Sequence, residues 1–284
     1  MSDIKFCEVC GGPLFSPPFV ELEGILQCKN CSHVHIFEKA KTIARTQAYG
    51  GSPIFDKFRN YFVFKMIYKI AKENNANSIF EIGFGEGWTL SKLKDKGFEI
   101  AGADVNQLNV RIVNKLKNDK SILRSSFEEA ILPDEKYDII YGIHLIEHLI
   151  DSSLAFKKAY KSLKPNGIAV FITPCANSRS FKIFGKNWWN LEDPTHLRFF
   201  SFDSIRIALS KAGFEETTIE MPIWDSLTVE ASSFLKIFQR KKNDAILHSF
   251  FGKILILFLT PIFFAFRLFN KFYSPSMLII AKKK

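Results

Sequence analysis

The amino-acid sequence predicts an α/β fold in which a doubly wound, parallel sheet follows a small metal-binding module. Between residues 78 and 174, short apolar segments alternate with segments of helical length, which is typical of a parallel sheet with crossover helices. Four of the five cysteines fall within the first 31 residues, at spacings used by metal ligands. The 284 residues, 47% of them hydrophobic, suffice for one sizeable domain and a smaller appendage.

The formal net charge of +10 indicates an anionic partner. Nucleic acid, a phosphorylated small molecule and an anionic membrane surface all meet this description, and charge alone does not choose among them. The clustered cysteines, with no signal-like apolar stretch at the N-terminus, favour a reducing compartment. We therefore expect a cytoplasmic protein, with peripheral placement on the inner face of the membrane as an alternative.

The N-terminal module, residues 1–40, contains two Cys-x2-Cys pairs separated by 17 residues. Four thiolates complete a tetrahedral zinc site and leave no open position for catalysis, so the expected Zn²⁺ is structural. Four reduced cysteines without metal would leave a 40-residue segment with too little core to fold. The expected metal ligands are Cys7, Cys10, Cys28 and Cys31.

Residues 41–76 are expected to form connector helices. The chain is interrupted at 50–53 by Gly-Gly-Ser-Pro, after which apolar residues recur at 58, 62, 66 and 70. This spacing predicts an amphipathic helix that packs on the next domain.

The segments of the α/β core follow in order. Strands are expected within 78–83, 98–105, 122–126, 137–146 and 168–174, and helices within 88–97, 106–118 and 151–167. A helix at 201–212, a strand near 214–223, the apolar segment and a short final run then complete the chain.

The stretch "EIGFGEGW", residues 81–88, places three glycines in the turn between the first core strand and the next helix. Glycine permits positive φ there and lets a ligand approach the backbone. Asp104 ends the next strand, 21 residues after Gly83, where an acid can bind two ribose hydroxyls. Glu81 would repel a diphosphate but suits a cofactor with cationic groups, which favours S-adenosylmethionine over a dinucleotide. A tight turn with an unrelated surface Asp is the alternative.

These motifs, with "YDIIYGIHLIEHLIDSSLAFKKAYKSLKPNGIAVFITP" after them, resemble class I S-adenosylmethionine-dependent methyltransferases over about 78 to 215. The resemblance implies a Rossmann-like sheet of seven strands, in which the last strand, Met277 to Lys282, inserts antiparallel between its neighbours. The domains become 1–40, a zinc-ribbon-like module; 41–76, the connector; 77–223, the methyltransferase core; and 224–284, an apolar helical segment and the final strand.

The same resemblance assigns cofactor-binding residues. It makes the glycine loop the methionine side of the site, Asp104 the ribose clamp and Val105 a neighbour of the adenine. Further adenine contacts follow the third strand, and two residues end the fourth strand beside the cofactor. The full expected set is Glu81, Gly83, Gly85, Gly87, Asp104, Val105, Ser126, Phe127, Ile143 and His144.

Two histidines are candidates for acid/base or acceptor-orienting roles, His148 and His196. His148 belongs to "HLIEH", and some relatives with Glu-x-x-Glu-His here bind a divalent metal; His144 replaces the first Glu. The alternative is that Glu147 and His148 fix the following loop by hydrogen bonds. His196 lies in "WWNLEDPTHLRFFS", where this fold usually carries its substrate-binding loop. Packing of a lid around a structural histidine is the alternative there.

The segment 250–273 is apolar around the whole helix, with basic residues at its edges. Such a segment must be buried in the fold, in a homodimer or in a membrane interface. Its uncharged run, 254–266, has 13 residues and is expected to be broken by Pro261, which makes a spanning helix an unfavoured interpretation.

The expected function is methyl transfer from S-adenosylmethionine to a hydroxyl or carbon of a sugar or lipid-linked cell-envelope intermediate, a small-molecule or glycan substrate. Relatives acting on nucleotide-linked sugars often carry a four-cysteine module. A ribosomal RNA base methyltransferase is a second hypothesis, less favoured because residues 1–38 contain only Lys5 and Lys29 as basic residues. A non-catalytic cofactor-binding protein is the third.

Overall fold

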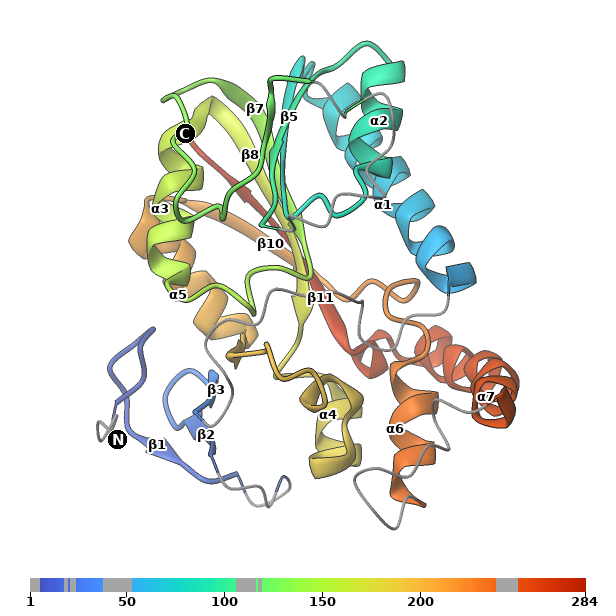
Figure 1. Ribbon diagram of the computed structural model, residues 1–284. Coiled ribbons are helices and arrows are strands. Elements are labelled where there is room, and N and C mark those ends of the chain that lie inside the picture. Colours follow the sequence, from blue (N-terminus) through green and yellow to red (C-terminus); the bar gives the residue numbers. More distant parts are fainter. Residues whose placement is uncertain are drawn as a thin grey trace. The chain divides into compact units, whose positions relative to one another are not determined.

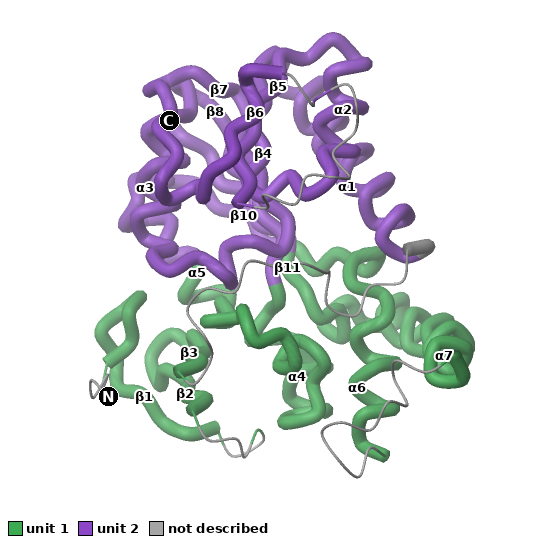
Figure 2. Tube along the Cα trace, in the orientation of Figure 1, with its two compact units in different colours: residues 1–41, 174–205, 220–277 green, residues 42–173, 206–219, 278–284 purple. Residues whose placement is uncertain are grey.

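The computed structural model describes residues 6–17, 20, 24–37, 53–105, 116, 119–238 and 250–284. The start of the predicted connector, 41–52, and all of the predicted helix at 106–118 except Leu116 lie outside the described residues. The chain divides into two compact units (Figure 2). The sheet unit comprises Thr42–Thr173, Arg206–Ile219 and Leu278–Lys284, and the ribbon unit comprises Met1–Lys41, Pro174–Ile205 and Glu220–Met277.

The sheet unit is built on a seven-stranded sheet of order β10-β11-β8-β7-β4-β5-β6. This confirms the predicted α/β, Rossmann-like fold. The strands are β4 (Ser78–Ile82), β5 (Glu99–Ala103), β6 (Ile122–Leu123), β7 (Tyr137–Ile143), β8 (Leu163–Pro174), β10 (Glu216–Glu220) and β11 (Ser276–Lys282).

Strand β4 lies at the point where the chain changes direction across the sheet. It pairs in parallel with β5 on one side and with β7 on the other. Ligands of open α/β sheets bind beyond the carboxyl ends of the strands at such a switch point. The last strand, β11, lies between β10 and β8, the predicted insertion.

Helices cover both faces of this sheet, which explains why its central strands are apolar without alternation. All five residues of β4 are buried, as is most of β8, a pattern typical of strands covered on both sides. In Figure 1, α1 and α2 lie on one side of the sheet and α3 lies on the other. The helices are α1 (Pro53–Glu73), α2 (Trp88–Asp95), α3 (Ser152–Ser162) and α5 (Phe202–Ala212).

The ribbon unit contains a four-stranded sheet of order β1-β2-β3-β9. Its strands are β1 (Leu14–Phe15), β2 (Ile25–Cys28), β3 (Val34–Ile36) and β9 (Arg198–Phe199). Strand β9 comes from the far half of the chain and pairs antiparallel with β3, with Val34 opposite Phe199. The N-terminal module therefore shares one sheet and one apolar core with the "DPTHLRFFS" segment, and that core includes Phe181 and Trp188.

The remaining helices also belong to the ribbon unit. They are α4 (Arg179–Phe184), η3 (Gly185–Asn187), η4 (Trp189–Leu191), α6 (Val229–Ile237), α7 (Phe250–Phe269) and η5 (Lys271–Tyr273). The expectation that Pro261 interrupts the apolar segment is wrong, because Pro261 lies inside α7, a single helix of 20 residues. A proline removes one backbone hydrogen bond, whereas Phe263 and Arg267 hold the helix beyond it through packing and polar contacts.

Candidate active site and metal centre

The glycine loop joins the carboxyl end of β4 to α2. Gly83, Gly85 and Gly87 have φ of +72°, +56° and +73°, a region that L side chains rarely adopt. A Cβ on Gly83 would lie 2.7 Å from the Leu145 side chain, but one on Gly85 would meet nothing within 4 Å. The backbone at Gly85 therefore faces open space that a ligand can approach.

Asp104 follows β5 and is joined to this loop by a hydrogen bond. The Gly85 amide donates to Asp104 Oδ2 at 2.7 Å, and Asp104 is buried. The predicted methionine-side loop and the predicted ribose clamp are thus joined by a hydrogen bond at one edge of the sheet. This contact also gives Asp104 a structural role, because it fixes the loop that carries the glycines.

Glu81 is buried near the end of β4 and accepts a hydrogen bond of 2.7 Å from Tyr141 Oη of β7. The pKa of Glu81 is raised to about 8: burial and the charge of Asp104 raise it, and the Tyr141 hydrogen bond partly offsets them. Two carboxyl groups close together in a buried site favour a cationic ligand. The ammonium group of S-adenosylmethionine has this charge.

The predicted adenine contacts differ in exposure. Val105 is 54% exposed, whereas Phe127 is buried with its ring 6.0 Å from that of Phe80. The Ser126 hydroxyl accepts from the Glu129 amide at 3.1 Å and turns the chain after β6. The side chain of Phe127 is therefore a core residue, and Val105 is the one of these three that is well exposed.

Ile143 ends β7, and His144 follows it with φ of +52°. A non-glycine residue in this region stores strain and is common where a site requires it. His144 Nδ1 lies 3.4 Å from Glu147 Oε1, and His148 Nε2 lies 3.9 Å from the same oxygen. Thr173 donates to Glu147 Oε2 at 2.9 Å. The fully buried Glu147 is thus the centre of a polar cluster at the ends of β7 and β8.

His196 belongs to the ribbon unit, where its ring is buried beside Phe199. Its Nδ1 lies 2.5 Å from the Asn190 carbonyl oxygen. A carbonyl can only accept, so Nδ1 must carry a proton. Nε2 lies 3.8 Å from Asp193 Oδ2, and Asp193 Oδ1 accepts from the amide and hydroxyl of Thr195. These contacts fix the orientation of the ring. A fixed ring is expected both for a structural histidine and for a catalytic base.

The four N-terminal cysteines form one cluster, as predicted. Their sulfur atoms all lie within 4.8 Å of one another, with Cys7 Sγ 3.7 Å from Cys31 Sγ and Cys10 Sγ 3.4 Å from Cys28 Sγ. None of the four is in a disulfide. The donor set fits a tetrahedral Zn²⁺.

Backbone amides also point at these sulfurs. The Val9 amide donates to Cys7 Sγ and the Gly12 amide donates to Cys10 Sγ, each at 3.4 Å. Such bonds favour thiolates, the form that binds metal. His33 contacts Glu8 and Ser204 through its two ring nitrogens, so the four thiols are the natural ligand set.

Sequence reasoning missed three residues that shape these sites. Tyr141 is opposite Glu81 in the β4–β7 register, so the pairing of two predicted strands could have found it. Asn190 contributes only its backbone carbonyl. Every residue has this group, so the sequence does not indicate the contact. Asp193 lies three residues before His196, a spacing that a turn brings together.

The chain is similar to known proteins over its α/β core. A protein-family model described as a methyltransferase domain matches residues 55–219. A ubiquinone biosynthesis O-methyltransferase from Bradyrhizobium diazoefficiens is 34% identical over 109 residues, which cover 37% of this chain and 43% of that protein. A probable S-adenosylmethionine-dependent methyltransferase from Mycolicibacterium smegmatis is 26% identical over 147 residues, covering 52% and 55%. The chain thus spans about half the length of the curated relatives it matches.

Among solved structures, a SAM-dependent methyltransferase from Archaeoglobus fulgidus superposes with a TM-score of 0.53 at 22% identity. The match covers 81% of this chain and 98% of that chain. At this identity the likeness shows the fold alone.

Proposed function

Because the chain belongs to the family of methyltransferase domains, we propose that it transfers a methyl group from S-adenosylmethionine to a sugar or lipid-linked cell-envelope intermediate. Membership of the family confirms the predicted class of enzyme. The substrate, the site residues and the bound zinc are parts of the proposal. The observation that carries the cofactor assignment is the joining of Asp104 to the glycine loop, beside the buried Glu81.

The residues present fit the cofactor. When bound, S-adenosylmethionine supplies a methyl group on a positively charged sulfonium. We assign Glu81 to the ammonium group, Asp104 to the ribose hydroxyls and the exposed Val105 to the edge of the adenine. In-line displacement depends mainly on positioning, so holding the cofactor at several points is the chief contribution of these residues.

An acceptor hydroxyl must also lose a proton, and His196 is the proposed base. The tautomer with its proton on Nδ1 has its lone pair on Nε2, which is the atom that can take a proton. His148, beside Glu147, is the second candidate. For either residue, loss of activity with unchanged cofactor affinity would support the role.

Two kinds of observation bear on the acceptor. Curated relatives are named ubiquinone biosynthesis O-methyltransferases, which favours an oxygen acceptor over carbon but does not point to a sugar. The zinc-ribbon-like module and the apolar segment 250–273 fit an enzyme that meets lipid-linked material, working from the cytoplasmic side with peripheral membrane contact. RNA remains the second candidate substrate, disfavoured by the scarcity of basic residues in 1–38.

Calorimetry with S-adenosylmethionine tests the cofactor assignment. Asp104→Ala should weaken binding about 10- to 100-fold, the loss expected for hydrogen bonds to a charged group. Asp134→Ala is the matched control, since Asp134 is a largely exposed carboxylate that pairs with Lys161 at 3.2 Å. Equal affinities for the wild type and Asp104→Ala would overturn the ribose assignment.

A thermal-shift screen of the cofactor-bound protein tests the substrate class. Nucleotide sugars, lipid-linked sugars and phenolic lipids form the panel. Stabilisation by a sugar compound, followed by methyl transfer to it, is the expected result. Copurifying RNA whose binding weakens steeply with salt would favour the RNA alternative instead.

A further inference from the structure

Helix α7 packs one side on the ribbon unit, partly through Phe263, and leaves a second apolar side exposed. Its buried residues are Gly252, Thr260 and Arg267. They are separated by 8 and 7 residues, about two helical turns each, and so lie on one face. The Thr260 hydroxyl donates to the Ile256 carbonyl at 2.7 Å. A helix that is apolar all round is normally buried, but only 17% of the most apolar 18-residue window of α7 is buried.

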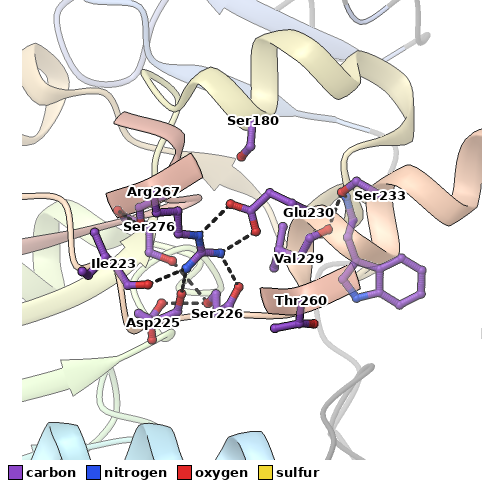
Figure 3. Close-up of polar contacts among 12 residues, drawn as sticks. Ser180, Ile223, Asp225, Ser226, Val229, Glu230, Ser233, Thr260, Arg267 and Ser276 are labelled. Carbon is purple, nitrogen blue, oxygen red and sulfur yellow. Dashed lines mark hydrogen bonds and ion pairs between the residues drawn. The ribbon is translucent and has the colours of Figure 1, made fainter. Parts of the chain in front are cut away.

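Arg267 fixes this orientation (Figure 3). Its Nε donates to Glu230 Oε1 at 2.8 Å, and Nη2 donates to the other oxygen of the same carboxylate. The remaining N–H groups donate to the carbonyls of Ile223, Asp225 and Ser226 at 2.9, 2.6 and 2.9 Å. Rotating α7 to bury its exposed apolar face would break this buried ion pair and leave Glu230 uncompensated, which is strongly unfavourable.

The outward face is large, aromatic and continuous along the helix. Phe258 is 71% exposed, Ile262 is 53% exposed and Phe269 is 90% exposed. The other exposed large apolar residues of the segment are Phe250, Phe251, Leu257, Phe266, Leu268 and Phe272. A helix of 20 residues is about 30 Å long. The exposed apolar face of α7 is therefore far larger than the single apolar side chains that are normal on protein surfaces.

The charged residues of segment 250–273 are all basic. Residues 250–273 contain no Asp or Glu, and Lys253 and Lys271, near the two ends, are exposed. Two copies of the chain, each with a net charge of +10, would bring like charges together across such a face. Anionic lipid headgroups would instead pair with both lysines.

We propose that α7 is a lipid-docking helix that lies in the plane of an anionic membrane, with its phenylalanine face in the acyl region. This inference rests on the membrane contact in the proposed function and names its partner, the residues that enter the lipid and the anchor that orients them. By length and composition α7 could also cross a membrane. Its inner side, however, is held by α6 and the 223–226 loop of the same unit, which leaves one face for lipid.

Cosedimentation of the full-length protein with vesicles tests this proposal. Phosphatidylcholine vesicles are compared with vesicles that also contain phosphatidylglycerol. We expect binding to the mixed vesicles, and each of Phe258→Glu and Ile262→Glu should lower the partition coefficient at least about tenfold. Lys253→Glu should lower it more than about fivefold, since it replaces an attraction with a repulsion.

Ile131→Glu is the matched control, since Ile131 is 93% exposed but lies in the sheet unit; it should bind vesicles as the wild type does. Unchanged circular dichroism and affinity for S-adenosylmethionine would show that the α7 variants are folded and that any loss concerns lipid alone. A wild type that ignores the mixed vesicles, or α7 variants that bind them equally well, would overturn the inference. So would a wild-type dimer that Phe258→Glu converts to monomers, because a second copy would then cover the face.

Discussion

Glu81 should make the stability of the cofactor-free protein fall as pH rises. Its pKa is raised by burial from 4.5 to about 8, so between these values the folded state holds a proton that the unfolded state has released. Stability decreases with pH wherever the folded state binds more protons. The contribution of Glu81 is therefore most favourable below about pH 4.5 and is lost progressively up to about pH 8.

The size of the effect follows from the two pKa values. A difference of 3.5 units, 8 minus 4.5, corresponds to a ceiling of about 5 kcal/mol at 1.36 kcal/mol per unit. The cost is about 1 kcal/mol at pH 5 and about 3 kcal/mol at pH 7, because the unfolded carboxyl is then ionised and the folded one is mostly protonated. Glu81→Gln should remove this dependence, since the amide cannot ionise and can still accept from Tyr141.

Urea denaturation of the cofactor-free wild type and Glu81→Gln at pH 5, 6, 7 and 8 measures the difference. Hydrogen exchange of the β4 amides identifies the transition that belongs to the sheet unit. Tyr141→Phe is the control: it removes the contact that lowers the pKa of Glu81, so the fall in stability should extend to higher pH. Parallel curves for wild type and Glu81→Gln would refute the reasoning.

Two further predictions concern the ribbon unit. Cys28→Ser should lose zinc that the wild type holds at about one ion per chain, whereas Cys175→Ser, at the buried cysteine outside the cluster, should keep it; equal zinc content by mass spectrometry would contradict the site. Arg267→Met should lower the free energy of unfolding by about 3 to 5 kcal/mol by stranding the buried Glu230. The double variant Arg267→Met/Glu230→Leu should recover most of this loss in urea denaturation, and a double variant as unstable as the single one would show that the cost is not electrostatic.

Much of the fold could be predicted because local patterns carry it. Buried parallel strands are apolar throughout and their helices are amphipathic, so the alternation from β4 to β8 is visible in the sequence. The cysteine cluster was equally predictable. The short spacing within each Cys-x2-Cys pair brings its two sulfur atoms together, and a tetrahedral metal site requires the sulfur atoms of both pairs.

The partners of the predicted residues could not be found in this way. Asp104 was expected to bind ribose, but its contact with the Gly85 amide depends on the spacing of β4 and β5. The Asn190 carbonyl that orients His196 belongs to a backbone group with no sequence signal. The pairing of β9 with β3 joins residues more than 160 positions apart. A strand of two residues is too short to show the alternation of apolar and polar residues from which strands are predicted.

The sequence by itself determined the fold class, the glycine loop with its two acids, the four-thiol cluster and the apolar character of 250–273, because each depends on residue types at short spacings. The tertiary structure decided which side chains these features contact and which of their surfaces are exposed. Strand register placed Tyr141 on Glu81 and so influences its pKa. The buried pair of Arg267 with Glu230 fixes α7 with Phe258 and Phe269 exposed. Such orientations depend on contacts between distant segments, which exist only once the chain has packed.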